Sequence, residues 1–160
     1  MGFDVSISNI NTEKMSAPYY LIGLVNRFNK SFQAAADSSF EELSWKQIFF
    51  MNCVALFEHA PTIKDMADLL GCSHQNAKQI LSKLEKQGFV EVIQDPADKR
   101  KQRIMLTEKA VDFRRRYDEP SEQAMQLIFG NITAEELRIT ISVFSRLNNN
   151  ADELKGRMAV

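Results

Sequence analysis

The sequence predicts a mainly α-helical fold with a small β-ribbon, organised around a helix-turn-helix. Two short segments with apolar residues at helical spacing are joined by a turn at Gly71, which is typical of a helix-turn-helix. Directly after them the apolar spacing changes to a period near two on both sides of a turn-rich loop, which predicts a β-hairpin. We therefore expect a winged helix-turn-helix domain at residues 43–107, a long helix within residues 16–42, and a long connecting helix and a final helix in residues 108–160.

The composition excludes several classes of protein. The 160 residues are 44% hydrophobic and 26% charged, which is ordinary for a soluble globular protein with one core. The apolar runs are far shorter than the roughly twenty residues of a membrane span, and the N-terminal segment has no basic-then-apolar leader, so we expect a cytoplasmic protein without a membrane partner. The two cysteines match no disulfide framework and no zinc-ligand pattern. Because no phosphate-binding loop or nucleophile motif is found either, we expect no enzyme activity and no cofactor.

The N-terminal region is expected to contain an arm and one helix. Residues 1–15 show no sustained apolar period, which indicates a flexible arm. From Ser16 to about Ala36, helical spacing predicts a long helix, and the polar run Asp37–Ser39 is expected to break it. Its apolar stripe is formed by Leu21, Leu24, Val25, Phe28 and Phe32. Such a stripe has to be covered by another apolar surface.

The next helix is expected to be the central, buried one. Ser44 and Gln47 have the spacing of a capping box, which predicts that a helix begins there. Apolar side chains surround much of this segment, which is typical of a buried element. We expect it to continue to about Glu58, before Pro61.

Two short amphipathic helices follow. Thr62 can cap the first, which Gly71 ends, and Ser73 can cap the second, which Gly88 ends. Each has apolar residues at positions i, i+3, i+4 and i+7. These are Ile63, Met66, Ala67 and Leu70 in the first helix, and Ala77, Ile80, Leu81 and Leu84 in the second. Their spacing predicts the helix-turn-helix.

The ribbon and two helices complete the pattern. Alternating strand residues on either side of the loop 95–101 are Phe89, Val90, Val92, Ile93, Ile104 and Leu106. A long helix is expected from about residue 108 to 129, interrupted or kinked near Pro120 because proline lacks a backbone N–H. After a break at Gly130, a capping box predicts a last helix that ends near Leu154.

Basic side chains are concentrated in the middle of the chain. Residues 73–116 contain 11 basic and 6 acidic side chains, whereas residues 1–72 contain 5 and 8, and residues 117–160 contain 4 and 7. The middle segment is therefore positive within a chain of net charge -1. A local excess of this kind is the electrostatic footprint of a DNA-binding protein, although a solvated surface is the ordinary alternative.

The second helix of the helix-turn-helix has a polar face that suits B-DNA. This face contains Ser73, His74, Gln75, Asn76, Lys78, Gln79 and Lys83. Gln and Asn can pair with adenine edges in the major groove, and Lys can reach guanine acceptors or phosphates. Ordinary surface helices contain the same residue types, so this face alone leaves both interpretations open.

The loop of the ribbon adds a second candidate contact with DNA. Lys99, Arg100 and Lys101 lie together at its tip, where they can enter a minor groove whose negative potential attracts arginine. Asp98 lies two residues before Arg100, and we expect its carboxylate to orient the guanidinium. The alternative is an aspartate that shapes the turn through its side chain.

Three motifs in this region have a distinctive spacing: Leu84–Val90 (LEKQGFV), Asp95–Arg100 (DPADKR) and Leu106–Lys109 (LTEK). They resemble the multiple-antibiotic-resistance regulator (MarR) family of bacterial winged-helix transcription factors. The resemblance implies a homodimer whose first and last helices intertwine, with residues 73–87 as recognition helix and Asp98 and Arg100 as the wing pair. Such a dimer would act as a repressor on a pseudo-palindromic DNA operator, with half-sites about one helical turn apart.

The resemblance also implies a site for a small aromatic effector. Its expected lining is Tyr19, Tyr20, Trp45, Phe49 and Phe113, although aromatic residues at helical spacing can equally form core. Cys72 precedes the recognition helix, whose positive end can lower a thiol pKa, so a redox-sensing regulator is one alternative function. Packing at the turn is the other interpretation of Cys72, and Cys53 is expected to be a buried structural thiol. A winged-helix module that scaffolds a protein partner without binding DNA is a further alternative.

Overall fold

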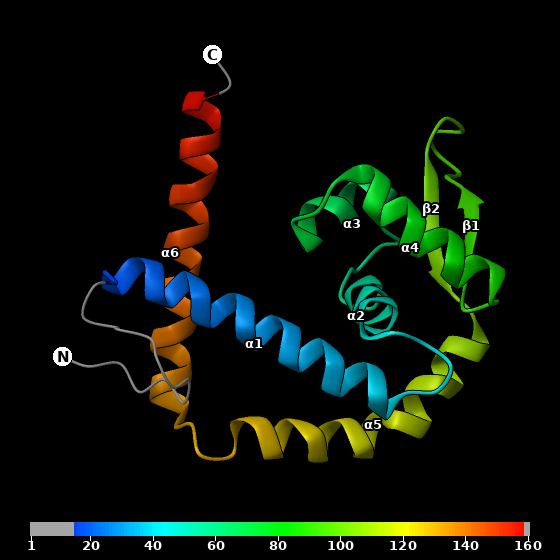
Figure 1. The fold of residues 1–160 in the computed structure, drawn as a ribbon. Helices are drawn as coiled ribbons and strands as arrows, with labels where there is room; N and C mark the ends of the chain where they lie inside the picture. The colour runs from blue at the N-terminus through cyan, green and yellow to red at the C-terminus, as the bar shows by residue number, and fades with distance from the viewer. Residues whose placement is uncertain (1–14, 159–160) are drawn as a thin grey trace. The chain divides into compact units, whose positions relative to one another are not determined.

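In its described part the protein is mainly helical with a two-stranded ribbon, as the sequence predicts. The computed structural model describes residues 15–158, so the arm predicted for residues 1–15 lies outside the described residues except at its last position. The chain divides into two compact units, which meet in sequence at Val111 and Asp112. The elements are α1 (Ala17–Ser39), α2 (Trp45–Val54), α3 (Ile63–Leu70), α4 (His74–Lys86), β1 (Val90–Gln94), β2 (Gln102–Leu106), α5 (Glu108–Phe129) and α6 (Ala134–Met158) (Figure 1).

Helix α2 is the central element of the first unit and contacts α3, α4 and β2. The predicted capping box is present at its start, where Gln47 Oε1 accepts hydrogen bonds from the Ser44 N–H at 3.0 Å and from the Ser44 hydroxyl at 2.9 Å. Phe50 and Met51 are fully buried. The surrounding core includes Leu43, Ile48, Cys53, Val54, Met66, Ala67, Ala77, Leu84, Phe89, Val90, Ile104 and Ala110. Burial of these apolar side chains stabilises the helix-turn-helix and the ribbon on a common core.

Helices α3 and α4 form the predicted helix-turn-helix. At the start of α3, the Asp65 N–H donates to Thr62 Oγ1 at 3.2 Å and the Thr62 N–H donates to Asp65 Oδ2 at 2.8 Å. Gly71 ends α3 with φ 60°, a left-handed conformation that glycine adopts without steric cost. Ser73 Oγ then accepts a backbone N–H of the first turn of α4 at 3.2 Å. These caps confirm the predicted bounds of both helices.

The ribbon is joined to the helix-turn-helix on both sides. Strands β1 and β2 are antiparallel, in a register that pairs Val90 with Leu106 and Gln94 with Gln102. On its other edge, β2 bonds to the segment before α3, where the Ile104 N–H donates to Pro61 O at 2.9 Å. Val90 and Ile104 are buried, so the ribbon covers the core on one face.

The predicted break of the first helix at Asp37–Ser39 is wrong, because α1 continues to Ser39. The hydroxyls of Ser38 and Ser39 both donate to Ala35 O, at 2.7 Å and 2.9 Å. Asp37 Oδ1 accepts the Trp45 N–H at 2.6 Å. The polar side chains thus complete the last turn of α1 and cap the start of α2, where the sequence suggested only a break.

The predicted end of the second helix near Glu58 is also wrong, because α2 ends at Val54. Beyond it the hydrogen bonds shorten to the i to i+3 kind, as from the Leu56 N–H to Cys53 O at 3.1 Å. Leu56 is exposed, so the buried face of the helix ends here although the apolar sequence continues.

Helix α5 has the predicted bounds but is not interrupted, and α6 is longer than predicted. Pro120 lies inside α5 without interrupting it, so the predicted interruption is wrong. Proline lacks the N–H that would bond to the carbonyl four residues earlier, and the alternative of a kink at Pro120 stays a prediction. Helix α6 passes the predicted end near Leu154 and includes Lys155 and Arg157 in its last turn, where positive charge stabilises the carboxyl end. Within residues 15–158, no helix is long and apolar enough to cross a membrane.

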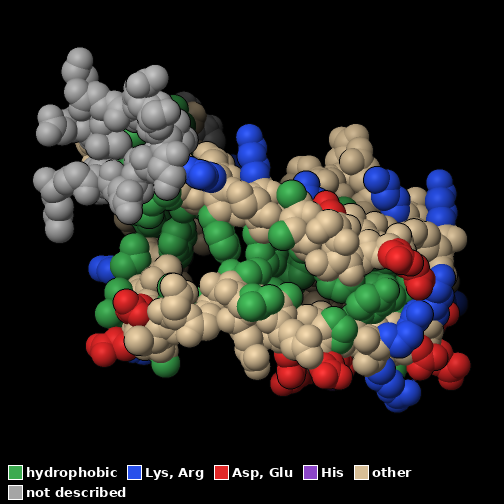
Figure 2. Space-filling view, turned by 60° about the horizontal axis from the view of Figure 1, so that its bottom comes forward, with side chains coloured by type: hydrophobic (Ala, Val, Ile, Leu, Met, Phe, Trp, Pro, Cys, Tyr) green, Lys and Arg blue, Asp and Glu red, His purple; other side chains and the backbone are tan. Residues whose placement is uncertain are grey.

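Helices α1 and α6 have no buried residue within the single chain. Large apolar side chains on them are exposed, namely Tyr19, Ile22, Leu24, Val25 and Phe28 on α1, and Leu137, Ile139, Ile141, Leu147 and Leu154 on α6. Hydrophobic side chains are accordingly visible at the surface of the chain (Figure 2). Apolar faces of this extent are typical of surfaces that bind another chain.

Candidate nucleic-acid interface

The polar face predicted for the second helix lies on the exposed side of α4. Ala77 and Leu84 are buried, and Ile80 and Leu81 are half-buried. The predicted contact residues are all exposed: Ser73, His74, Gln75, Asn76, Lys78, Gln79 and Lys83. The face therefore presents amide and ammonium groups to the surroundings of the molecule. Its role in binding DNA stays a prediction.

At the tip of the ribbon, Asp98 and Arg100 are in contact. Asp98 Oδ1 accepts hydrogen bonds from the Arg100 N–H at 3.1 Å and from Arg100 Nε at 3.2 Å, and Lys101 Nζ lies 3.8 Å from Asp98 Oδ2. The backbone and guanidinium donors of Arg100 hold the pKa of Asp98 below its ordinary value. Asp98 thus both shapes the turn and orients the guanidinium, so the two alternatives from the sequence hold together. The Arg100 side chain is 92% exposed, and Lys99 and Lys101 are exposed beside it.

Asp95 and Arg103 form an ion pair at the base of the wing. Arg103 Nε donates to Asp95 Oδ2 at 2.6 Å, and Arg103 Nη1 donates to Ala60 O at 3.0 Å. Asp95 Oδ1 accepts the N–H groups of Ala97 at 2.7 Å and Asp98 at 3.1 Å. These donors, the Ala97 N–H first, hold the pKa of Asp95 below its ordinary value. The sequence analysis missed this pair, although an arginine within an alternating strand and an Asp-Pro turn were its signals.

A second polar cluster, also missed, surrounds the carboxyl end of α4. Gln47 Nε2 donates to Gln87 Oε1 at 2.7 Å, and Gln87 Nε2 donates to Glu42 O at 3.3 Å. Lys109 Nζ donates to Gln87 O at 2.9 Å and lies 4.2 Å from the centre of the Phe89 ring. Side chains from other parts of the first unit therefore bond to one end of the candidate recognition helix.

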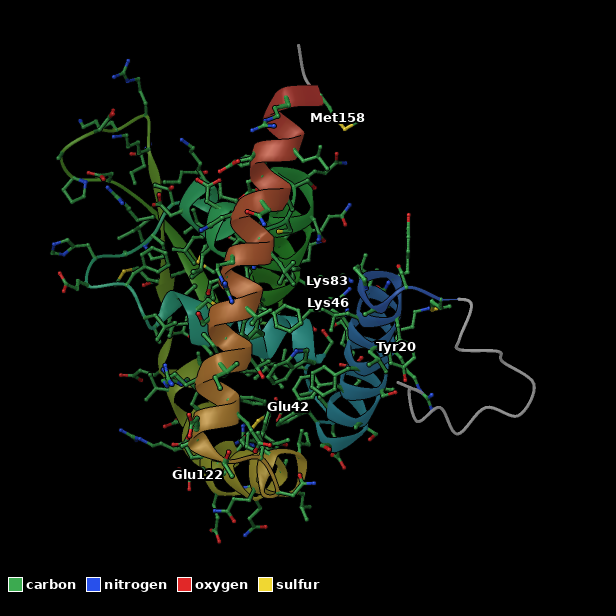
Figure 3. All side chains as sticks on the ribbon, turned by 90° about the vertical axis from the view of Figure 1, so that its left-hand side faces the viewer. Tyr20, Glu42, Lys46, Lys83, Glu122 and Met158 are labelled. Atoms are coloured by element: carbon green, nitrogen blue, oxygen red, sulfur yellow. The ribbon has the colours of Figure 1, made fainter. Side chains whose placement is uncertain are left out.

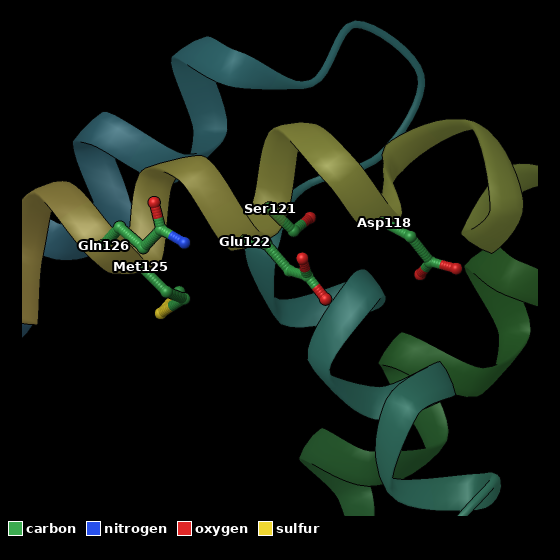
Figure 4. Close-up of a pocket in the computed structure, with 5 residues that line it drawn as sticks. All are labelled: Asp118, Ser121, Glu122, Met125 and Gln126. Atoms are coloured by element: carbon green, nitrogen blue, oxygen red, sulfur yellow. The ribbon is translucent and has the colours of Figure 1, made fainter.

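The predicted effector residues do not form one described cavity. Trp45 stacks on Phe49 with ring centres 5.7 Å apart and meets the edge of Phe32 at 4.7 Å. Tyr19 is exposed and Phe113 is buried. The described pocket of 370 Å³ lies along α5 instead and is lined by Asp118, Ser121, Glu122, Met125 and Gln126 (Figure 4). The aromatic effector site stays a prediction.

The two cysteines differ in their surroundings. Cys53 is buried, and this burial raises the pKa of its thiol, as expected for a structural residue. Cys72 is half-buried, and its N–H donates to Ala67 O at 3.1 Å in the turn after α3. The described residues contain no group of three His, Cys, Asp or Glu that could hold a metal ion.

Comparison with known proteins agrees with this geometry. Residues 43–101 match the sequence model of the MarR family. The uncharacterised HTH-type transcriptional regulator YybA of Bacillus subtilis is 20% identical over 132 residues, which are 82% of this chain and 86% of that protein. The solved MepR–DNA complex from S. aureus aligns with a TM-score of 0.74 at 16% identity, over 85% of this chain and 99% of that chain. The organohalide-sensing regulator RdhR in its 2,4-dichlorophenol-bound form aligns with a TM-score of 0.76 at 21% identity, over 92% and 89%.

At these identities the solved structures establish the fold, while the match of residues 43–101 establishes the family of the domain. The matched residues contain α2, α3, α4, β1 and the wing tip, which are the elements that form the candidate interface. We therefore identify residues 43–101 as a MarR-family domain, in a chain with the fold of MarR transcriptional regulators.

Proposed function

We propose that the protein is a homodimeric, sequence-specific DNA-binding repressor that a small aromatic ligand releases from its operator. The observation that carries the proposal is the exposure, within one domain, of the polar face of α4 and of the three cations at the wing tip. Helix α4 enters the major groove, and the wing at residues 95–101 enters the adjoining minor groove. MepR, which shares this fold, has been solved in complex with DNA, and this supports DNA as the partner.

The dimer follows from the apolar surfaces of α1 and α6. Each helix exposes a row of large apolar side chains and has no buried residue within one chain. A second copy of the chain is the partner that we propose for them, because a dimer also matches the two-fold symmetry of a palindromic operator. Occupation of such an operator would exclude other proteins from the same DNA, which is the basis of the repressor assignment.

The ligand is proposed from a relative with the same fold. RdhR is described as organohalide-sensing and has been solved with 2,4-dichlorophenol bound. In this chain Phe32, Trp45 and Phe49 form an aromatic cluster at the contact of α1 with α2, and aromatic rings favour a planar apolar ligand. A compound of that class would bind and lower the affinity for DNA.

A salt titration against random duplex DNA tests the proposed function. We expect binding at low salt that weakens steeply as the salt concentration rises, because phosphate contacts release counterions. Gln75→Ala and Gln79→Ala should relax the base preference found by selection from a random pool, with the salt dependence unchanged. If the wild-type protein binds no duplex at low salt, the repressor assignment is wrong and the result supports the scaffold alternative.

A further inference from the structure

We infer that Gln47 and Gln87 are a positioning pair, which fixes the angle of the recognition helix on α2 and thereby sets base discrimination. The inference rests on the proposed function. It assigns Gln47 and Gln87 a role that acts through α4 and involves no contact of their own with DNA. It derives from the 2.7 Å hydrogen bond between the two amides, which joins residues forty positions apart in the chain. The pair connects α2 with the end of α4. Figure 3 labels Lys46 on α2, Lys83 on α4 and Glu42 in the segment before α2.

On the α2 side the pair is held rigidly. Gln47 and Asp95 are the buried polar residues of the described chain, so Gln47 has little freedom to move. Its Oε1 is already held by the N–H and the hydroxyl of Ser44, which orients its Nε2 toward Gln87. A buried amide whose oxygen and nitrogen both have partners has one favourable position, because a move would leave one of these polar atoms without its partner.

On the α4 side the pair holds the helix at its carboxyl end. Gln87 is the C-cap of α4, and its amide both accepts from Gln47 and donates to Glu42 O. Its carbonyl accepts from Lys109 Nζ, and Thr107 Oγ1 donates to the carbonyl of the next residue at 2.8 Å. Four side-chain hydrogen bonds thus meet within two residues of the helix end, whereas the first turn of α4 is exposed.

Because the helix is long, a small tilt at Gln87 would displace its opposite end, near the bases, by a larger distance. Gln75 lies about 18 Å along the axis from Gln87, at about 1.5 Å per residue. A tilt of about 5° at Gln87 would move that end of the helix by about 1.5 Å, which is half the length of a hydrogen bond. Bidentate contacts with bases do not tolerate such a shift, whereas flexible lysine contacts with phosphates do.

The test therefore measures base discrimination and not affinity alone. Each variant is titrated with a duplex selected by the wild-type protein from a random pool and with a random duplex, and the ratio of the two Kd values is compared. Gln87→Met keeps the length of the side chain and removes its amide. Gln47→Glu keeps acceptor oxygens for Ser44 and removes the donor to Gln87. Gln33→Met is the matched control, because it removes a glutamine hydrogen bond of 2.7 Å to Asn29 that lies within α1 alone.

We expect Gln87→Met and Gln47→Glu each to lower the ratio by about threefold to tenfold, the equivalent of one neutral hydrogen bond. Random-duplex affinity and its salt dependence should stay at the wild-type level, because phosphate contacts are unchanged. The double variant should lose no more than the larger single loss, since both changes break the same bond. Gln33→Met should keep the wild-type ratio.

A variant that only destabilises the fold would give a different result. It lowers the melting temperature but leaves the ratio unchanged when DNA binding is measured well below that temperature. A ratio in Gln87→Met within about twofold of wild type, or losses that add in the double variant, would overturn the inference alone. A wild-type protein that binds no duplex at all would overturn the proposed function, and the positioning role with it.

Discussion

Replacement of Arg100 by alanine tests the wing assignment most directly. The guanidinium is 92% exposed and is held by Asp98 Oδ1 at 3.2 Å, so its loss removes a cation without disturbing the core. Each protein cation that displaces a counterion from DNA contributes about 0.9 to the slope of log Kd against log salt concentration, so a dimer that loses two such cations loses about 1.8. Over a fourfold rise in salt, from about 50 to about 200 mM, this change makes the loss of affinity about tenfold smaller than in the wild type.

The assay is fluorescence anisotropy of a labelled duplex at several salt concentrations. Arg100→Lys keeps the charge and should keep the slope, although it loses the planar contact with Asp98. Arg157→Ala is the matched control, because it also removes an exposed arginine, one that lies 3.9 Å from Glu153 on α6. An Arg100→Ala protein with the wild-type slope at every salt concentration would refute the placement of the wing in a DNA groove.

Three further predictions concern stability and assembly. The folded-state pKa of Asp95 lies below its ordinary value of 3.8, so its carboxylate stabilises the fold above that pH, and this contribution is lost as the pH falls through the folded-state pKa. In thermal melts, the melting temperature of Asp95→Asn should therefore fall less on acidification than that of the wild type. Equal decreases in the two proteins would contradict the assignment. Leu84→Ala should lower the free energy of unfolding by about 2–5 kcal/mol in urea titrations, because Leu84 is fully buried, whereas the exposed Leu69→Ala should cost under about 1 kcal/mol. Ile139→Asp in α6 should shift the protein from dimer to monomer in sedimentation velocity, while Asn149→Asp on the same helix should not; a dimeric Ile139→Asp protein would exclude this surface from the interface.

The helix-turn-helix was predictable because its signals are local. Thr62, Gly71 and Ser73 have side chains or conformations that define helix ends without help from the rest of the fold. Ala77 and Leu84 mark the inward face by spacing alone. The exposed face of α4 then follows by subtraction, which is why its residues could be named from the sequence.

The features that sequence analysis missed depend on contacts between distant residues. Gln47 has the spacing of a capping residue, but nothing in that spacing indicates that its amide nitrogen meets Gln87. Arg103 looks like an outward strand residue, yet it turns toward Ala60 O and Asp95. The helix ends at Ser39 and Val54 were misjudged for the same reason, because side-chain bonds and burial fixed them more strongly than local propensity.

The hydrogen bonds at the base of the wing have a consequence for how new binding specificities can arise. The Asp95 N–H donates to Lys101 O at 3.0 Å and the Arg103–Asp95 pair closes the loop below it, so residues 96–100 leave and re-enter the fold at fixed points. A tip of different sequence or charge can therefore replace these residues without repacking the core. Substitutions at the tip and substitutions on the exposed face of α4 form two sets that can be varied independently of each other. We expect a library that varies both sets to keep the fold, because neither set belongs to the buried core.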